Sequence, residues 1–323
     1  MNIRQQFSRA QWPATIAAAN DGFTSASAGA IVVAGDIPEA STKGALLIFL
    51  KPEISQLVKP VVEKIVGHML ASAREHGIDI YGASVLSGRH LLRTRFLQRN
   101  YQSIHNHAQV SSLIGASSLR LQGDGNDIGA NIIGVNAVIG GLVAVKRMIT
   151  ADNLQTAWTV GRDKIVKLED DCYALPLSLA GRRHLVLNGF YPKQLCRYAR
   201  GGSRIIAFAC RTDAPVSALK RHFQGDADPR ICEPDSMRWH LHRHMKQYGI
   251  DEFNTSTNGI HMSANAEDGE RELELLIECA MALGPVRQFP CGLARDAPPS
   301  PSTGGSPQGR NNMSCVDQQG KTP

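Results

Sequence analysis

The feature that most constrains the fold is the stretch GALLIFLKPE, in which an uninterrupted apolar run from Gly44 to Leu50 is followed by Lys51 and then by a proline. An apolar run without charges is typical of a strand buried inside a sheet. Proline has no backbone N–H to donate to a central ladder, so Pro52 predicts that the strand ends just before it. We therefore expect Lys51 at the end of a buried strand, where its charge has to be directed at a partner.

Strand and helix patterns alternate around this run. Apolar residues recur at helical spacing from Val58 to Met69, and Gly77 is placed to end that helix. A second strand is predicted from Ile78, a helix from His90, and a strong third strand from Ser203. The order is β-α-β-α, an insertion, then α-β-α-loop-α-β-α. It predicts an α+β fold, a ferredoxin-like split β-α-β sandwich: a mostly antiparallel sheet with helices packed on one face.

The chain divides into three parts by composition. Residues 1–43 form an N-terminal extension, 44–283 form the folded domain, and 284–323 form a tail rich in Pro, Gly and Ser that we expect to be disordered. Gly, Ser and Asn are frequent at about 108–183, which predicts an insertion with a glycine-rich surface loop. GDGNDIG at Gly123 lacks the strand–turn–helix context of a phosphate loop.

Charge and cysteine content narrow the class of protein. A formal charge of +6 and 42% hydrophobic residues suit a globular protein with a phosphate-rich partner. No basic stripe with interleaved aromatics is present, so we expect nucleotides rather than polymeric nucleic acid. Seven cysteines at irregular spacings favour free thiols in a reduced compartment. The expected location is cytoplasmic without membrane contact; an organellar transit segment at the N-terminus is the alternative.

A lone histidine occurs in the apolar stretch NGIHMS, and strand periodicity predicts how it is oriented. Side chains alternate along a strand, so Ile260 and Met262 face the core while His261 and Ser263 face the other way. A histidine with a purely structural role is the alternative. The helix that follows carries two acids, Glu270 and Glu272, at the edge of its apolar stripe. Either could bind one imidazole nitrogen and leave the other free to attack.

Five further histidines are not expected to bind metal. His240, His242 and His244 alternate within a predicted helix, where neighbours at that spacing diverge. His105 and His107 form no stronger pattern.

Four segments, LLIFLKPE, RHFQGDADP, EPDSMR and NGIHMSANAEDGERELELL, resemble in the same order the active-site elements of nucleoside diphosphate kinases. The family pattern Asn-x-x-His-x-Ser falls on Asn258, His261 and Ser263, and the family's orienting glutamate falls on Glu272. The spacing of its two phosphate-binding arginines matches Arg221 and Arg238. The matching segments cover about 44–92 and 190–283.

The resemblance implies a ping-pong phosphoryl transfer. His261 would take the γ-phosphate of ATP or another nucleoside triphosphate, hold it as phosphohistidine, and pass it to a nucleoside diphosphate. Lys51, Arg221 and Arg238 would bind phosphate oxygens. Magnesium would arrive with the nucleotide, without a separate metal site, and family members commonly assemble as homo-oligomers. Asn258 would bind the sugar, Ser263 would lie beside the histidine, and Tyr191 or Phe190 would stack on the base; core packing is the alternative for Phe190.

Several positions depart from the family pattern. Met262 replaces the usual glycine after the histidine, and Ala227 aligns with a phosphate-binding threonine. About ten extra residues separate Arg238 from Asn258, and the insertion interrupts the region that closes over the base. These changes leave two alternatives to the kinase: a non-catalytic nucleotide-binding or scaffolding module, and phosphate transfer from His261 to a protein acceptor.

Overall fold

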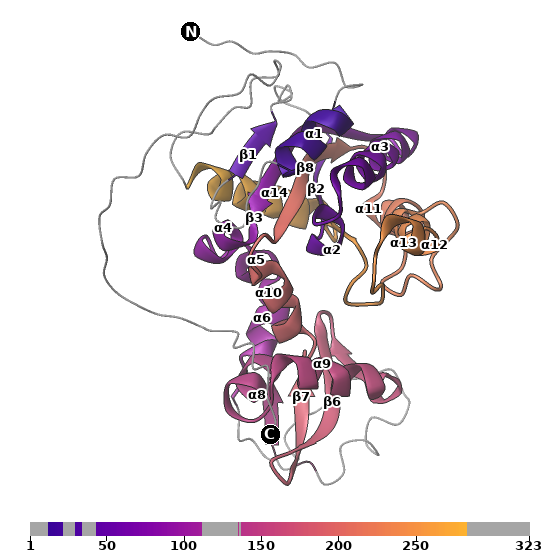
Figure 1. Cartoon of the computed structure of the whole chain (residues 1–323). Coiled ribbons are helices and arrows are strands. Elements are labelled where there is room, and N and C mark those ends of the chain that lie inside the picture. Colours follow the sequence, from indigo (N-terminus) through magenta and orange to yellow (C-terminus); the bar gives the residue numbers. More distant parts are fainter. Residues whose placement is uncertain (1–11, 22–29, 34–42, 112–134, 136, 283–323) are drawn as a thin grey trace, which may run out of the picture. The chain divides into compact units, whose positions relative to one another are not determined.

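The computed structural model describes residues 12–21, 30–33, 43–111, 135 and 137–282 (Figure 1). The predictions for the GDGNDIG loop and for the C-terminal tail lie outside these residues. Within them, no helix is both long enough and apolar enough to cross a membrane.

The main sheet has five strands, all paired antiparallel, in the order β1-β3-β8-β2-β9. Two strands joined by helix α3 (Lys59–Glu75) are separated by an antiparallel strand, which is the split β-α-β arrangement. The predicted fold class is confirmed. The strands are β1 (Ala30–Val33), β2 (Gly44–Leu50), β3 (Ile78–Ser87), β8 (Arg204–Thr212) and β9 (Ile260–Met262).

Strand β2 is buried on both faces, which explains its unbroken apolar sequence. Leu46, Ile48 and Leu50 pack into a core with helix α3, and the alternate residues of β2 pack into a second core with helix α14 (Ala266–Met281). Helices therefore cover both faces of the sheet, and the prediction that they pack on one face is wrong.

Part of the predicted N-terminal extension belongs to the folded structure. Helix α1 (Trp12–Asp21) buries Trp12 and Ile16 in the same core as α3. Strand β1 pairs with β3 at the edge of the main sheet. Short apolar segments of this kind are hard to recognise from sequence because their burial depends on distant partners.

The segment after β3 forms three short helices instead of one: α4 (Gly88–Arg93), α5 (Phe96–Asn100) and α6 (Gln102–Ala108). Arg95 adopts a left-handed conformation with φ of 54°, which breaks the helix between α4 and α5. A second break, at Tyr101, separates α5 from α6.

A second, four-stranded sheet occupies much of the predicted insertion and has the order β4-β7-β6-β5. Strands β4 and β7 are parallel, and the β7-β6-β5 portion is an antiparallel meander. These strands were not predicted from the sequence. The elements are β4 (Ala137–Gly140), α8 (Gly141–Arg147), α9 (Ala151–Val160), the 3₁₀ helix η3 (Arg162–Lys164), β5 (Val166–Glu169), β6 (Cys172–Leu179) and β7 (Arg182–Leu187).

The remaining helices are short and lie mostly between β8 and β9 in the sequence. One of them, η4, is a π-helix, a wider turn in which the backbone bonds reach one residue further than in an α-helix. These helices are α2 (Pro52–Ser55), α10 (Tyr191–Ala199), α11 (Val216–Leu219), η4 (Lys220–Gln224), α12 (Met237–Arg243) and α13 (Met245–Tyr248).

The alternating histidines diverge as predicted, but two of them join a third from another helix. His242 stacks near Phe253, with ring centroids 6.1 Å apart. His240 stacks instead on His68 of α3, at 3.6 Å, and lies 4.4 Å from the ring of His244. Burial first, and then the charges of His68, His244 and Lys64, lower the pKa of His240 to about 4.

This histidine stack makes a prediction for stability. The ordinary histidine pKa is about 6.5, so between pH 6.5 and about 4 the unfolded chain binds a proton at His240 that the folded chain does not. The free energy of unfolding should therefore fall as the pH falls through this window. After allowance for solvent screening of a half-buried ring, we expect a loss on the order of 1–2 kcal/mol from this group.

Urea denaturation at pH 7.5 and 5 would measure the effect. His240→Gln should flatten the pH dependence, while His242→Gln on the same helix should leave it as in the wild type. An equal pH dependence in all three proteins would contradict the assignment to His240.

Candidate active site

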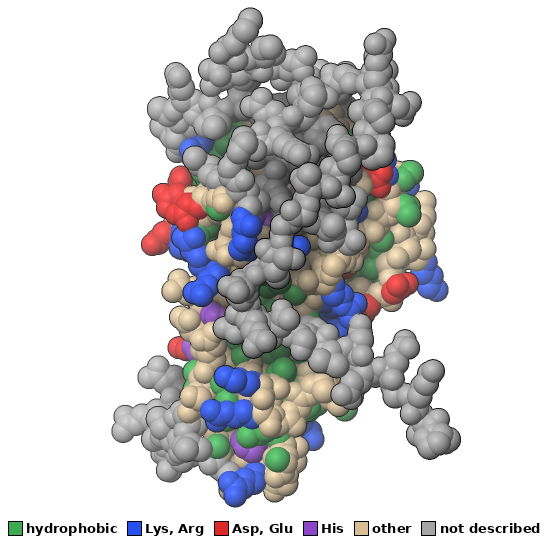
Figure 2. Space-filling model, turned by 60° about the vertical axis from the view of Figure 1, so that its left-hand side comes forward, with side chains coloured by type: hydrophobic (Ala, Val, Ile, Leu, Met, Phe, Trp, Pro, Cys, Tyr) green, Lys and Arg blue, Asp and Glu red, His purple; other side chains and the backbone are tan. Residues whose placement is uncertain are grey.

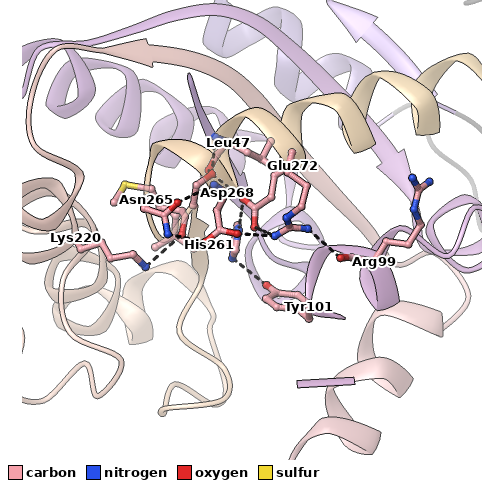
Figure 3. A network of polar contacts seen from close by, with 12 residues as sticks. Leu47, Arg99, Tyr101, Lys220, His261, Asn265, Asp268 and Glu272 are labelled. Atoms are coloured by element: carbon pink, nitrogen blue, oxygen red, sulfur yellow. Dashed lines mark hydrogen bonds and ion pairs between the residues drawn. The ribbon is translucent and has the colours of Figure 1, made fainter. Parts of the chain in front are cut away.

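His261 lies on β9 with both imidazole nitrogens engaged (Figure 3). Its Nε2 is 3.1 Å from a carboxylate oxygen of Glu272 on α14. Its Nδ1 is 3.1 Å from the hydroxyl of Tyr101. Only 13% of the side chain is exposed. The imidazole is thus held from two sides, by Glu272 of the helix that follows β9 and by Tyr101, which is distant in the sequence.

These partners determine the tautomer of His261. A carboxylate can only accept hydrogen bonds, so Nε2 carries the proton and donates it to Glu272. Burial raises the pKa of Tyr101, so its phenol stays protonated and can donate to Nδ1. Burial also lowers the pKa of His261, against the opposing effect of Glu272. At neutral pH the ring is therefore neutral, with its lone pair on Nδ1.

The structure distinguishes between the two candidate acids. Glu272 is buried, and its Oε2 accepts hydrogen bonds from both His261 and the hydroxyl of Ser263, the latter at 2.7 Å. Glu270 is exposed and lies 3.8 Å from Arg211. Glu272 is thus the acid that orients the imidazole.

Ser263 holds Glu272 in place. It is completely buried, and its Oγ accepts a hydrogen bond from the backbone N–H of Leu47 at 2.9 Å. Because its hydroxyl proton is donated to Glu272, Ser263 fixes the position of the carboxylate that binds His261. Strand alternation predicted that this hydroxyl lies on the same side as His261, but its partner was not predicted.

The predicted alternation on β9 is confirmed. Ile260 and Met262 are buried in the core with α3, while His261 stacks on Phe49 of β2 with ring centroids 4.4 Å apart. The extra bulk of Met262, which replaces the family's usual glycine, therefore lies on the face away from the imidazole. Met262 does not crowd the site.

Lys51 ends β2 as predicted, and it is buried with its charge. Its Nζ donates to Oδ1 of Asn258 at 2.6 Å. Among the described residues, no carboxylate lies within ion-pair distance of this ammonium. Burial, opposed by Glu53 and aided by Arg238, lowers the pKa of Lys51 to about 8.

A tight turn places Asn258 beside Lys51. Gly259 has φ of +78°, and a Cβ there would come within 2.6 Å of Leu241, so this position requires glycine. The carboxylate of Glu53 accepts the backbone N–H of Gly259 at 2.9 Å. Asn258 itself is buried, and its amide nitrogen donates to two backbone carbonyls. The side chains of Lys51 and Asn258 are therefore rigidly presented.

Arg238 is a second buried cation. Its guanidinium donates to the carbonyl oxygens of Gly225 and Ile260, at 3.0 and 3.1 Å. Its Nε is buried and has no hydrogen-bond partner among the described residues. Burial lowers the pKa of Arg238 to about 10, which still leaves it charged at neutral pH.

Arg221 lies differently from the prediction. Its side chain is 71% exposed, and it forms an ion pair with Glu233. The neighbouring Lys220 is half-buried, and its Nζ is 3.5 Å from the carbonyl of Met262 (Figure 3). The π-helical bond from the N–H of Gly225 to the carbonyl of Lys220 shifts the register by one residue. Lys220, rather than Arg221, thus lies beside β9.

The predicted base-stacking aromatics belong to a different cluster. Tyr191 is fully buried, and its ring packs against His105 at 5.7 Å. Phe190 packs against Trp158 and Tyr173, so core packing, the alternative weighed for it, is what the structure shows. A base needs an exposed ring face for stacking, and Tyr191 offers none in this conformation.

Two cations of the site are buried, unlike the Lys and Arg side chains on the surface. Figure 2 shows Lys and Arg side chains in several separate groups on one face of the molecule. Lys51 and Arg238 are inside instead, and the charges of Lys51 and Lys220 both act on His261. A neutral imidazole thus lies under the positive charges of Lys51 and Lys220, an arrangement that suits a polyanionic ligand.

The sequence matches no protein-family model and no curated protein. Solved structures similar to the chain include nucleoside diphosphate kinase from Encephalitozoon cuniculi, at 11% identity over 72% of this chain and 88% of that chain, with a TM-score of 0.34. An NDP kinase from Pyrobaculum aerophilum has 11% identity over 72% of this chain and 94% of that chain, with a TM-score of 0.34. Nucleoside-diphosphate kinase from Borrelia burgdorferi, with bound vanadate and ADP, has 13% identity over 72% of this chain and 84% of that chain, with a TM-score of 0.31. Similarity at this level identifies no family for the chain.

Proposed function

We propose that this protein is a nucleoside diphosphate kinase that transfers the γ-phosphate of a nucleoside triphosphate through a phosphohistidine on His261. One observation carries the proposal. The imidazole of His261 is held in a single neutral tautomer by Glu272, and it lies under the charges of buried Lys51 and half-buried Lys220, neither of which has a carboxylate within ion-pair distance among the described residues. Burying such charges is unfavourable unless a ligand of opposite charge compensates for them.

In the first half-reaction the lone pair of Nδ1 attacks the γ-phosphorus in line. The new N–P bond forms while the bond from phosphorus to the bridging oxygen breaks, and the nucleoside diphosphate leaves. Glu272 keeps the proton of Nε2 in place and stabilises the positive ring of the phosphohistidine. The second half-reaction is the reverse, with a different nucleoside diphosphate as the acceptor.

Tyr101 has to move its hydroxyl for this attack. That hydroxyl donates to Nδ1, the atom proposed as the nucleophile. When a phosphate approaches, the same O–H can turn to a phosphate oxygen without losing a hydrogen bond. Lys51, Lys220 and Arg238 supply the positive charge for the other oxygens, with Arg221 reaching the ligand only if it leaves Glu233.

Asn258 is proposed to bind the sugar hydroxyl, and magnesium is proposed to enter with the nucleotide. Two carboxylates of the site are already engaged, Glu272 by His261 and Glu53 by the N–H of Gly259. This agrees with magnesium held by phosphate oxygens and water, where it neutralises phosphate charge. Nucleotide partners, assembly into a homo-oligomer and a cytoplasmic location all remain part of the proposal.

One observation favours the non-catalytic alternative. Tyr101 occupies the nucleophilic nitrogen, and His261 is only 13% exposed. If this arrangement persists with nucleotide present, the protein would bind nucleotides without phosphate transfer. Transfer from His261 to a protein acceptor shares the phosphohistidine with the main proposal and differs only in the second step.

A labelling experiment separates these functions. The full-length protein is incubated with magnesium and ATP labelled at the γ-phosphate, and the protein-bound label is tested for acid lability and stability in base. We expect label on the wild type and on His242→Gln, and rapid release of that label on addition of GDP with formation of labelled GTP. Label that GDP cannot discharge would indicate a protein acceptor. ATP binding without any label would contradict phosphate transfer.

A further inference from the structure

Three side chains outside the His261 site bring different metal-ligating atoms together. His107 lies in α6, Glu169 ends β5 and Cys172 begins β6. Their ligand atoms lie within 4.8 Å of one another. Nε2 of His107 is 2.8 Å from a carboxylate oxygen of Glu169. Nowhere else in the described part of the chain do three His, Cys, Asp or Glu side chains meet in this way.

The donor set suits zinc. Imidazole nitrogen, thiolate sulfur and carboxylate oxygen are the three kinds of atom that bind Zn²⁺ in proteins. Bonds of about 2.0–2.3 Å in tetrahedral geometry place such atoms roughly 3.3–3.6 Å apart, which these side chains reach with small rotations. Nδ1 of His107 is buried without a hydrogen-bond partner among the described residues, so the protein alone does not fully satisfy this ring.

A buried asparagine already holds the two supporting elements together. The amide nitrogen of Asn188 donates to the carbonyl of Ile104 in α6 and to that of Asp171 in the turn between β5 and β6. Its amide oxygen accepts the N–H of Tyr173 in β6, at 2.9 Å. The three ligands thus come from elements whose relative position is fixed without the metal, which lowers the entropy lost on binding.

The three proposed ligands differ in exposure, so a metal ion can reach them from solvent. Cys172 is 3% exposed, whereas the side chains of His107 and Glu169 are 24% and 65% exposed. A cation can therefore approach from the carboxylate side and meet the thiol at the inner end. Solvent on the exposed side would supply a water molecule as the fourth ligand.

We propose that His107, Glu169 and Cys172 bind one divalent transition-metal ion, with zinc as the preferred ion. On binding, the S–H bond of Cys172 breaks, its proton passes to solvent, and a metal–sulfur bond forms. The ion links α6 to the β5–β6 hairpin. Tyr101 directly precedes α6, so the link also steadies the helix that follows the tyrosine on His261.

Cobalt provides a direct probe, because Co²⁺ bound to a thiolate has a charge-transfer absorption in the near ultraviolet. The full-length, metal-stripped protein is titrated with Co²⁺ and then with Zn²⁺ in competition. We expect one ion per chain, displacement by zinc, and a higher Tm with zinc. Cys172→Ser should lose the absorption, and Glu169→Gln should weaken affinity by at least about 100-fold. Cys279→Ser, a matched buried cysteine on α14, should behave as the wild type.

The result that overturns the proposal is an absorption that survives in Cys172→Ser, or one that disappears in Cys279→Ser instead. Absence of binding to the wild type would overturn it as well. If circular dichroism shows that Cys172→Ser does not fold, Glu169→Gln decides, since that side chain is mostly exposed. Unchanged cobalt affinity in folded Glu169→Gln would contradict the site.

Discussion

His261→Asn is expected to lower kcat for phosphate transfer from ATP to GDP by about 10⁴- to 10⁶-fold, the range found when an enzyme loses its nucleophile. Asparagine keeps a polar N–H that can donate to Glu272, so the buried acid retains a partner. It has no ring nitrogen with a free lone pair, so no phosphoenzyme can form. Steady-state turnover measured beside circular dichroism separates this loss from unfolding.

His242→Gln is the matched control for this substitution. That histidine lies on α12 and packs near Phe253, and it has no role in the proposed mechanism. We expect wild-type turnover from it. Phosphate transfer near the wild-type rate by a folded His261→Asn protein would rule out a phosphohistidine at this position.

Lys51→Met is expected to lower kcat/KM for the nucleotide by about 10²- to 10³-fold, as loss of one preorganised charge donor does in other enzymes. The same substitution should stabilise the fold. The ammonium is buried without a carboxylate partner among the described residues, and methionine fills similar space without a charge. A variant that is less active and more stable indicates that the lysine is retained for binding rather than for folding.

The pH dependence of this stabilisation provides a second check. Folding lowers the pKa of Lys51 to about 8 from its ordinary value near 10.5. Below pH 8 the lysine is charged in both states, and its burial costs about 3 kcal/mol. Between pH 8 and 10.5 only the unfolded chain is protonated, so this cost shrinks and is gone above 10.5.

Urea denaturation of the wild type and Lys51→Met at pH 7 and pH 10 measures this difference. The advantage of Lys51→Met should be largest at pH 7 and much smaller at pH 10. A variant that is less stable than the wild type at pH 7 would show that Lys51 serves the fold, and it would remove the main support for a phosphate site at this strand end.

In strand β2 and the β9 segment, the local sequence pattern was enough to predict the structure. An unbroken apolar run ending at Pro52 was enough to predict a buried strand with Lys51 at its end, because proline and burial act on the residues themselves. Alternation on β9 was enough to place His261 and Met262 on opposite faces. The split β-α-β order followed from the sequence of strand and helix signals.

Other features could not be read from the chain. Glu270 and Glu272 have equivalent positions in the helical pattern, and only the packing of α14 against β2 and β9 buries Glu272 beside Ser263. The resemblance assigned Arg221 to phosphate by its spacing from Arg238, whereas in the structure Arg221 is exposed and the π-helix η4 places Lys220 beside Met262. A one-residue change in register leaves no trace in composition.

The sequence by itself determined the class of fold and the face on which His261 lies, because both depend on periodicities of two or 3.6 residues within single elements. Only the tertiary structure decided which groups meet. Tyr101 on Nδ1 of His261, and His107 beside Glu169 and Cys172, join elements that are far apart in the chain. Such contacts depend on how whole elements pack, and the free energy of packing is a sum over many side chains that no single segment determines.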